Sequence, residues 1–340
     1  MAKHKPRVIV LHPRHWARPE YREGCKLDIS HVSIGGKIPR KRKGIPTFDG
    51  YADMATKEGK QELFKARNPD LFLFWMHGNF RPADLRMLKA ESPSTKFVMW
   101  FGNHRYSVSG AVRNMAKWLD AVLINSAHPQ QLKIYRKAGF QTFTLWDGFD
   151  PSDVKLRETK PKYDLVFGGN SYMEPAKAEP KLDFPGGQIR YEFICECYKR
   201  FKMLVRSGHP KFWPFPCEPE VFHPKYTDFL REGKITVNLN HFPEFTRAYT
   251  RRTIRCLFAR RCHVTLYIPG MEQDFKNHEN IVWFNEVEEG VDMIRYYLDH
   301  DEERERIAER CYQVALKKFT FKERLRDFER IAGKVLGRNL

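Results

Sequence analysis

Short apolar runs that alternate with helix-like stretches place the strongest constraint on the fold of this chain. The runs are rich in β-branched, aromatic and leucine residues, as buried strands are. The predicted strands cover residues 8–11, 71–75, 97–100, 121–124, 142–145, 164–167, 203–205, 235–239, 263–267 and 281–284. This alternation is typical of α/β units built around a parallel sheet.

A polar stretch divides the predicted strands into two series. Residues 151–162 carry two prolines and no apolar periodicity, which is typical of a linker. We therefore expect an N-terminal Rossmann-like domain over residues 1–150 and a C-terminal one over residues 163–320. A chain of 340 residues is long enough to bury a core in each. Residues 321–340 are expected to form a C-terminal helix that packs back on the N-terminal domain.

The chain is strongly basic. It has 60 Lys and Arg residues against 42 Asp and Glu residues, which gives a net charge of +18. This balance favours a polyanionic partner, either nucleic acid or an anionic membrane surface. No apolar run is long enough to span a membrane, so we expect no transmembrane segment. The seven cysteines are odd in number and lack metal-ligand spacing, so we expect reduced thiols in a cytoplasmic protein.

Polar residues follow many predicted strands, at the positions where open α/β sheets bind their ligands. In the first half these positions hold His77, His104 and Asp147, and in the second half they hold residues 168–171 and Asn238. If the two sheets face each other, these residues enclose a cleft in which a transferase could bind its donor and its acceptor. Each residue taken alone also fits a turn or a helix cap.

Several blocks in the second half resemble one enzyme family. They occupy residues 163–170, 234–240, 252–259, 271–275, 281–284 and 301–304. In order and in sequence they are similar to the donor domain of GT-B glycosyltransferases, most closely to the family related to the CgeB spore-maturation proteins. The resemblance implies a GT-B fold, in which two Rossmann-like domains turn their parallel sheets to a central cleft. It also implies an acceptor-binding N-terminal domain and a nucleotide-sugar donor, with a UDP-sugar as the default.

The donor-binding residues are expected around a glycine pair and an arginine cluster. Gly168 and Gly169 follow a strand, where backbone amides can approach a phosphate. The arginines are spaced so that at least two share a helix face and suit a diphosphate. A tight turn and a solvated helix face are the alternative interpretations. The candidates are Gly168, Gly169, Asn170, Ser171, Asn238, Arg247, Arg251, Arg252, Arg255, Glu272 and Asp274.

Two of these arginines depart from the family pattern. Related enzymes often hold the donor ribose or sugar with two glutamates, and the resemblance places Arg247 and Arg255 at those positions. The replacement argues against the usual ribose contact and the retaining machinery of the family, but it is compatible with phosphate binding and would even favour it. Glu272 and Asp274 are the first candidates for the carboxylate role. No Asp-x-Asp sequence stands near a suitable strand, so we predict no metal.

Glycosyl transfer needs stabilisation of the departing diphosphate and, for inversion, a base that deprotonates the acceptor hydroxyl. The candidate bases are Asp49, His77, His104 and Asp147. A histidine has a suitable intrinsic pKa, but histidines at strand ends are also often structural. Asp49 fits an N-cap equally well.

A basic segment in the N-terminal domain points to the acceptor. Five of its seven residues are Lys37, Arg40, Lys41, Arg42 and Lys43, and glycines flank it. A basic arm of this kind suits the backbone of double-stranded DNA, although a solvated charged loop is the alternative. Together with the net charge, it favours transfer of a sugar to a hydroxymethylated pyrimidine base in DNA, as in the DNA-modifying glycosyltransferases of bacteriophages.

Two other functions fit the same sequence. The first is a GT-B glycosyltransferase that acts on a cell-surface or lipid-linked glycan or on a protein, with its basic face on an anionic membrane surface. The second is a catalytically inactive GT-B protein that binds nucleic acid, which the two replaced glutamates would permit. Turnover of a nucleotide sugar separates the inactive protein from both enzymes.

Overall fold

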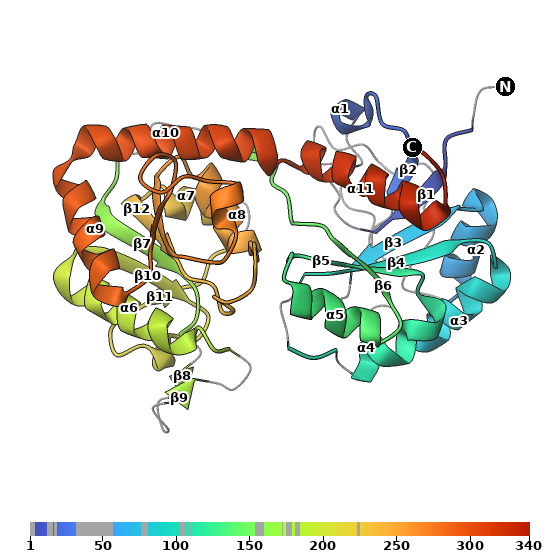
Figure 1. Cartoon of the computed structure of the whole chain (residues 1–340), viewed down its shortest axis with the longest axis horizontal. Helices are drawn as coiled ribbons and strands as arrows, with labels where there is room; N and C mark the ends of the chain where they lie inside the picture. The colour runs from blue at the N-terminus through green and yellow to red at the C-terminus, as the bar shows by residue number, and fades with distance from the viewer. Residues whose placement is uncertain are drawn as a thin grey trace. The chain divides into compact units, whose positions relative to one another are not determined.

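The computed structural model describes residues 4–11, 16, 19–31, 57–75, 81–102, 106–108, 110–153, 160–171, 173–174, 179–180, 184–222 and 225–340. The predicted bases Asp49, His77 and His104 and the basic segment 37–43 lie outside this set. The chain divides into two compact units (Figure 1). The first unit comprises residues 1–125, 129–146 and 321–340, and the second comprises residues 126–128 and 147–320.

The first unit is built on a parallel sheet with the strand order β2-β1-β3-β4-β5-β6. Its strands are β1 Arg7–Val10, β2 Asp28–His31, β3 Leu71–Trp75, β4 Lys96–Phe101, β5 Ala121–Ile124 and β6 Gln141–Thr144. The five strands predicted for this half are confirmed, each to within one residue at its start. Strand β2 was not predicted, because its sequence Asp-Ile-Ser-His holds one apolar residue and no apolar run.

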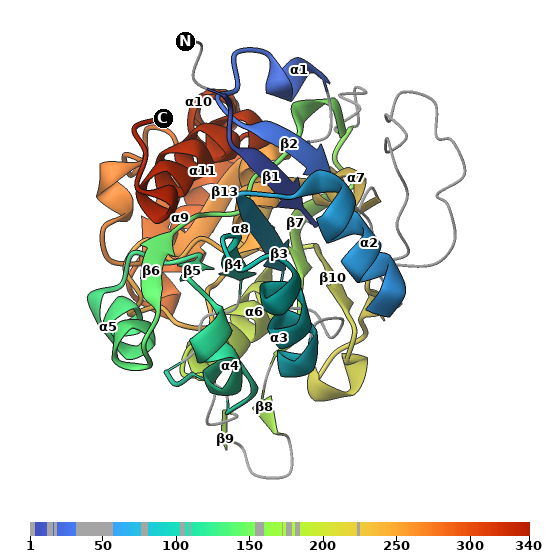
Figure 2. The same ribbon diagram turned by 90° about the vertical axis from the view of Figure 1, so that its right-hand side faces the viewer.

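Helices cover both faces of the first sheet. Along β3, Phe72 and Phe74 pack toward one face and Leu71 and Leu73 toward the other, as the alternation of a strand requires. The first face is covered by α2 Lys57–Arg67, α3 Pro82–Glu91, α4 Gly110–Met115 and α5 Pro129–Lys137. The opposite face is covered by α1 Pro19–Arg22 and α11 Phe321–Leu336, as Figures 1 and 2 show.

Aromatic contacts fasten α11 to the first sheet. The ring of Phe328 is fully buried and lies 5.2 Å from the ring of Trp16, which in turn stacks on Trp100 of β4. The Trp16 indole N–H donates a hydrogen bond to the carbonyl of Phe321 at 2.9 Å. The last helix of the chain is therefore part of the core of the first unit.

The second unit is built on a parallel sheet with the strand order β11-β10-β7-β12-β13-β14. Its strands are β7 Tyr163–Gly168, β10 Met203–Ser207, β11 Glu218–Pro219, β12 Gly233–Asn238, β13 Cys262–Leu266 and β14 Val282–Phe284. Counted along the chain, this order is 3-2-1-4-5-6, the order of a Rossmann fold. It reverses between β7 and β12, so a ligand site is expected at the carboxyl ends of these strands.

Helices also cover both faces of the second sheet (Figure 1). One face packs against α6 Gly187–Arg200 and α9 Val287–Asp299, and the other packs against α7 Lys225–Leu230 and α8 Arg251–Phe258. Helix α10 Asp301–Lys318 packs against α8 and β13. The remaining short elements are β8 Met173–Glu174, β9 Glu179–Pro180 and the 3-10 turns η2 Ala116–Trp118, η3 Pro151–Asp153, η4 Pro210–Phe212 and η5 Met271–Gln273.

The predicted pair of Rossmann-like α/β domains is confirmed. The boundary between the units lies after Trp146, ahead of the predicted linker 151–162. The reason is Phe149, whose N–H donates to the carbonyl of Phe319 at 2.9 Å and whose ring stacks on Phe258. These contacts hold the chain in the second unit before the linker begins. Among the described helices, none is both long and apolar enough to cross a membrane.

We predict that Phe328→Ala destabilises the first unit by about 3–5 kcal/mol, because it removes a buried ring that contacts Trp16. Urea unfolding followed by tryptophan fluorescence measures the loss. Lys322→Ala, at an exposed position of the same helix, is the control and should change the unfolding free energy by less than about 0.5 kcal/mol. Equal stability of the two variants would show that α11 is not part of this core.

Candidate functional site

A cavity of about 240 Å³ opens in the second unit where the sequence predicted a ligand site. It draws residues from the loops after β7, β10 and β11 and from helices α7 and α8. Its walls are Gly168, Gly169, Asn170, Arg206, Gly208, Glu220, Val221, Phe222, Tyr226, Arg252 and Arg255. Since β7 and α8 stand on the two sides of the point where the strand order reverses, the cavity lies at the topological switch of the sheet.

The two glycines after β7 make room for side chains of the neighbouring helices. The Tyr226 hydroxyl donates to the carbonyl of Gly168 at 3.1 Å and lies 2.7 Å from the place that a Cβ of residue 168 would take. A Cβ at residue 169 would overlap the guanidinium of Arg252. The Gly169 amide donates to the carbonyl of Arg206 at 2.9 Å and so extends the sheet. The glycines thus bring Arg252 close to the strand end, and the Gly169 amide is already used within the protein.

Two arginines donate hydrogen bonds to one histidine nitrogen beside the cavity. Nε2 of His241 lies 3.2 Å from Nη1 of Arg190 and 3.0 Å from Nη2 of Arg252. Guanidinium groups only donate, so the network assigns Nε2 as an acceptor and the ring as neutral, with its proton on Nδ1. Arg190 is buried, and it also donates to the carbonyls of Asn170 at 3.1 Å and of Leu239.

The charge on the cavity wall is positive. Arg255 lies with its guanidinium carbon 5.2 Å from the centre of the Tyr226 ring, and no carboxylate within the described chain pairs with it. Burial and the nearby Arg251 lower the pKa of the Arg255 guanidinium. Arg206 donates to the carbonyl of Pro219 at 3.1 Å. Three arginines against one glutamate leave the described wall with two excess positive charges, an arrangement that suits a diphosphate.

Arg247 and Asp274 lie outside the cavity wall and bind each other. Nε and Nη2 of Arg247 donate to the two oxygens of Asp274 at 2.7 and 2.9 Å. The Tyr249 hydroxyl and Lys318 Nζ also donate to this carboxylate, at 2.8 and 3.2 Å. Burial alone would raise the pKa of Asp274, but the hydrogen bonds from Arg247 and Tyr249 outweigh it and hold the pKa below its usual value. Asp274 therefore joins η5 to the end of α10, and its oxygens are occupied.

The other predicted carboxylates are also placed away from the cavity wall. Glu272 accepts a hydrogen bond from the exposed Tyr267 hydroxyl at 3.1 Å. Asp147 is buried, forms an ion pair with Arg251 and accepts the Gly148 N–H at 2.9 Å. Both oxygens of Asp147 are thus engaged, so the structure gives it the role of an anchor for α8.

Of the predicted polar residues after the strands of the second sheet, Asn170 lines the cavity, whereas Ser171 and Asn238 form hydrogen bonds within the protein core. Asn170 Oδ1 accepts hydrogen bonds from the Ser207 hydroxyl at 2.9 Å and from the Gly208 N–H at 3.1 Å, which ties the loops after β7 and β10 together. Ser171 is buried and donates to the carbonyl of Phe212. Asn238 is buried and donates to the hydroxyl of Thr253 at 3.0 Å, which holds α8 against β12.

Eight residues of this site were not predicted from the sequence. They are Arg190, Arg206, Gly208, Glu220, Val221, Phe222, Tyr226 and His241. Arg206 follows the predicted strand 203–205 directly, so the strand-end rule could have found it. Arg190 and Tyr226 lie within helices, where no local signal marks a residue that will reach a strand end.

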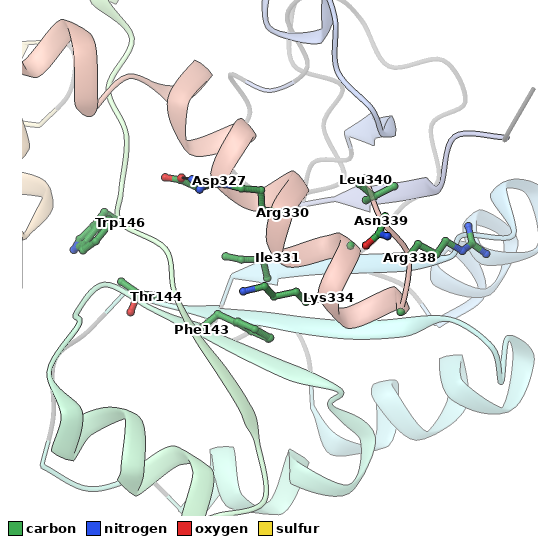
Figure 3. Close-up of a pocket in the computed structure, with 12 residues that line it drawn as sticks. Phe143, Thr144, Trp146, Asp327, Arg330, Ile331, Lys334, Arg338, Asn339 and Leu340 are labelled. Atoms are coloured by element: carbon green, nitrogen blue, oxygen red, sulfur yellow. Dashed lines mark hydrogen bonds and ion pairs between the residues drawn. The ribbon is translucent and has the colours of Figure 1, made fainter.

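A second cavity, of about 880 Å³, lies in the first unit between the edge strand β6 and α11 (Figure 3). Ile331 and Lys334 extend from α11 toward Phe143 of β6. Its exposed basic side chains are Arg330 and Lys334 of α11 and Arg338, which follows the end of the helix and pairs with Asp70 at 3.3 Å. Within the described part of the chain, no group of three or more His, Cys, Asp and Glu side chains is arranged to hold a metal ion.

Comparisons with known proteins agree with this architecture. A family model described as glycosyl transferase-like matches residues 157–330, just over half of the chain. No curated protein matches the chain in sequence.

Solved structures match over nearly the whole chain. A glycosyltransferase from Rickettsia africae has a TM-score of 0.62 at 14% identity, with 99% of this chain and 100% of that chain covered. Anabaena Alr3699/HepE in complex with UDP and glucose has a TM-score of 0.60 at 12% identity, with 97% and 100% covered. Sucrose-phosphate synthase from Thermosynechococcus elongatus has a TM-score of 0.56 at 9% identity, with 98% and 100% covered. These likenesses confirm the predicted GT-B fold.

We predict that Asp274→Asn lowers the unfolding free energy by about 3 kcal/mol at neutral pH, because it leaves the half-buried Arg247 without its anion. The folded-state pKa of Asp274 lies below its ordinary value of 3.8, so its stabilisation is complete above that pH and is lost as the pH falls through the folded-state pKa. The difference from the wild type should therefore shrink below about pH 4.

Urea unfolding at a series of pH values tests this prediction. Asp292→Asn serves as the control, because this aspartate pairs with Arg295 at an exposed position and should contribute little. A difference between wild type and Asp274→Asn that stays constant from pH 7 to pH 3 would contradict the assignment.

Proposed function

We propose that this chain, which belongs to the glycosyl transferase-like family, transfers a sugar from a UDP-sugar to a hydroxymethylated pyrimidine base in double-stranded DNA. The family rests on the match over residues 157–330. The main evidence for a nucleotide-sugar donor is the cavity at the switch point of the second sheet, which is lined by glycines and by an excess of arginines.

The cavity suits the diphosphate of a nucleotide sugar. Arg252 and Arg255 project from successive turns of α8 into the same cavity, and Arg206 faces it from the end of β10. In glycosyl transfer, negative charge develops on the diphosphate as the sugar departs, and guanidinium groups held in place stabilise it. Arg252 is held by His241 and by the carbonyl of Gly168, so it needs little reorganisation to act.

UDP is chosen as the nucleotide of the donor because a protein of the same fold has been solved with it. Anabaena Alr3699/HepE, which shares the fold, has been solved in complex with UDP-glucose and with UDP. At 11–12% identity, the shared fold guides the choice of UDP as a probe. The sugar has to be identified by experiment.

We predict that Arg252→Ala and Arg255→Ala each raise the dissociation constant for UDP by roughly tenfold to a hundredfold, the loss expected for one charge-assisted hydrogen bond. Isothermal titration calorimetry with UDP and UDP-glucose measures the effect. Arg310→Ala, an exposed arginine on α10, is the matched control and should bind like the wild type. Wild-type affinity in both cavity variants would contradict the assignment of the site.

The charge of the first unit supports a polyanionic acceptor. On the cavity wall drawn in Figure 3, Asp327 forms an ion pair with Arg330. Asp327 also forms an ion pair with Arg324. Lys334 has no carboxylate partner within the described chain. The face of α11 that borders β6 therefore carries excess positive charge, in a chain whose net charge is +18. The sequence adds the basic segment 37–43, which lies in the N-terminal half of the chain.

We predict that the double variant Lys334→Ala/Arg338→Ala weakens binding to duplex DNA. It should also reduce the slope of the logarithm of the binding constant against the logarithm of salt concentration by about 1 to 2, one unit for each lost phosphate contact. The control is Lys133→Ala/Lys137→Ala on α5, which removes the same charge at the same spacing from the other face of the sheet. Fluorescence anisotropy at several salt concentrations gives both quantities. Equal slopes for the two double variants would contradict the role of α11.

Product analysis separates this function from its alternatives. The protein is incubated with a panel of nucleotide sugars and with duplex DNA that contains hydroxymethylated bases, and the nucleosides are then analysed by mass spectrometry. A mass gain of one sugar on one base supports the proposal. Donor turnover without DNA modification shifts the acceptor to a glycan, lipid or protein. DNA binding without donor binding identifies an inactive nucleic-acid-binding protein.

A further inference from the structure

The wall of the cavity in the second unit carries two chemically different sets of side chains. Arg252 and Arg255 enter it from α8, whereas Glu220, Val221 and Phe222 enter it from the segment after β11. A diphosphate neutralises the arginines but is repelled by a carboxylate and gains nothing from an exposed aromatic ring. The segment 220–222 therefore suits a group other than phosphate.

Glu220 occupies a position that the sheet itself defines. β11 pairs with β10 in parallel, with Pro219 opposite Ser207, so Glu220 and Gly208 are the residues that follow the two strand ends. The Glu220 carboxylate lies over Gly208, and its carboxyl carbon is 2.8 Å from the place that a Cβ of residue 208 would take. Any side chain at residue 208 would thus displace the carboxylate. In a sheet of order 3-2-1-4-5-6, an acidic side chain near the end of the second strand is placed to accept hydrogen bonds from a ribose.

The Glu220 carboxylate has no hydrogen bond or ion pair within the described chain. It is also the one acidic side chain on the described cavity wall. An ionised carboxylate only accepts hydrogen bonds, and its two oxygens match the two hydroxyl donors of a vicinal diol. The wall of the same cavity thus offers a carboxylate acceptor, which Arg255 cannot replace because a guanidinium only donates hydrogen bonds.

Phe222 supplies a second, independent observation. Its side chain is 69% exposed, the largest exposed fraction among the bulky hydrophobic residues of the described chain. It borders the same cavity two residues beyond Glu220. An aromatic ring exposed at the edge of a polar cavity offers a stacking surface for a nucleobase.

We propose that Glu220 and Phe222 form the nucleoside end of the donor site. Glu220 accepts hydrogen bonds from the 2′- and 3′-hydroxyls of the ribose, and Phe222 stacks on the base. Gly208 leaves the space in which the carboxylate sits. The nucleotide then lies with its ribose at β11 and its diphosphate at α8. This inference rests on the proposed function of the cavity as a nucleotide-sugar site.

The test compares three probes that carry different parts of the nucleotide: UDP, 2′-deoxyuridine 5′-diphosphate and inorganic pyrophosphate. Wild-type protein should bind UDP about fivefold to tenfold more tightly than the deoxynucleotide, because the deoxynucleotide lacks one hydroxyl donor. Glu220→Ala should bind both nucleotides equally, and its affinity for UDP should be about fivefold to tenfold lower than that of the wild type. Pyrophosphate binding should stay unchanged or become tighter, because a negative charge has been removed.

The second variant and the controls make the outcome specific. Phe222→Ala should weaken both nucleotides about tenfold and leave pyrophosphate unchanged, and Phe222→Trp should restore nucleotide binding. Glu218→Ala, an exposed glutamate on β11, should behave like the wild type. Thermal melting of each variant confirms that it is folded.

Three outcomes overturn the inference. If Glu220→Ala still binds UDP more tightly than the deoxynucleotide while Arg255→Ala loses its affinity for UDP, the proposed function stands. The assignment of Glu220 to the ribose is then wrong. If Phe222→Ala weakens the binding of pyrophosphate as much as the binding of UDP, or weakens the binding of neither, Phe222 does not stack on the base. If the wild type binds pyrophosphate but neither nucleotide, both the nucleoside subsite and the proposed donor are wrong.

Discussion

One imidazole nitrogen that accepts hydrogen bonds from two guanidinium groups holds the candidate site together. Arg190 comes from α6 on one face of the second sheet and Arg252 comes from α8 on the other, and both reach Nε2 of His241 just after β12. Because guanidinium groups only donate, this contact requires a neutral ring. A protonated His241 would set three positive charges against one another, and the position of Arg252 at the end of β7 would be lost. The geometry of the cavity wall depends on this contact.

The topology of the sheet explains why a few residues from distant parts of the chain can form one site. The order 3-2-1-4-5-6 places the loops after β7 and β10 side by side and brings α8 across from the other side of the switch point. Glycines at 168, 169 and 208 then let side chains approach the backbone more closely than any other residue would allow. The ion pairs of Asp147 with Arg251 and of Asp274 with Arg247 hold the elements around the cavity in place and lie outside its wall.

The strands could be predicted because burial on both faces of a parallel sheet demands continuous apolar runs. β2 and β11 escaped prediction for the same reason: Asp28–His31 and Glu218–Pro219 lie at sheet edges and have no such run. In the site, Gly168, Gly169, Arg252 and Arg255 could be found because they follow a strand or share a face of the helix that follows one. The pairing of Arg247 with Asp274 could not, because the two residues are 27 positions apart and meet only through the fold.

Hydrogen–deuterium exchange of the full chain with and without UDP reports where the nucleotide binds without altering any residue. If UDP binds in the cavity of the second unit, exchange slows in peptides that cover residues 168–171, 206–208, 218–222 and 250–256 and stays unchanged in those that cover β1 to β6. Saturating UDP that leaves these four segments unchanged, or that slows exchange only elsewhere, would contradict binding in this cavity.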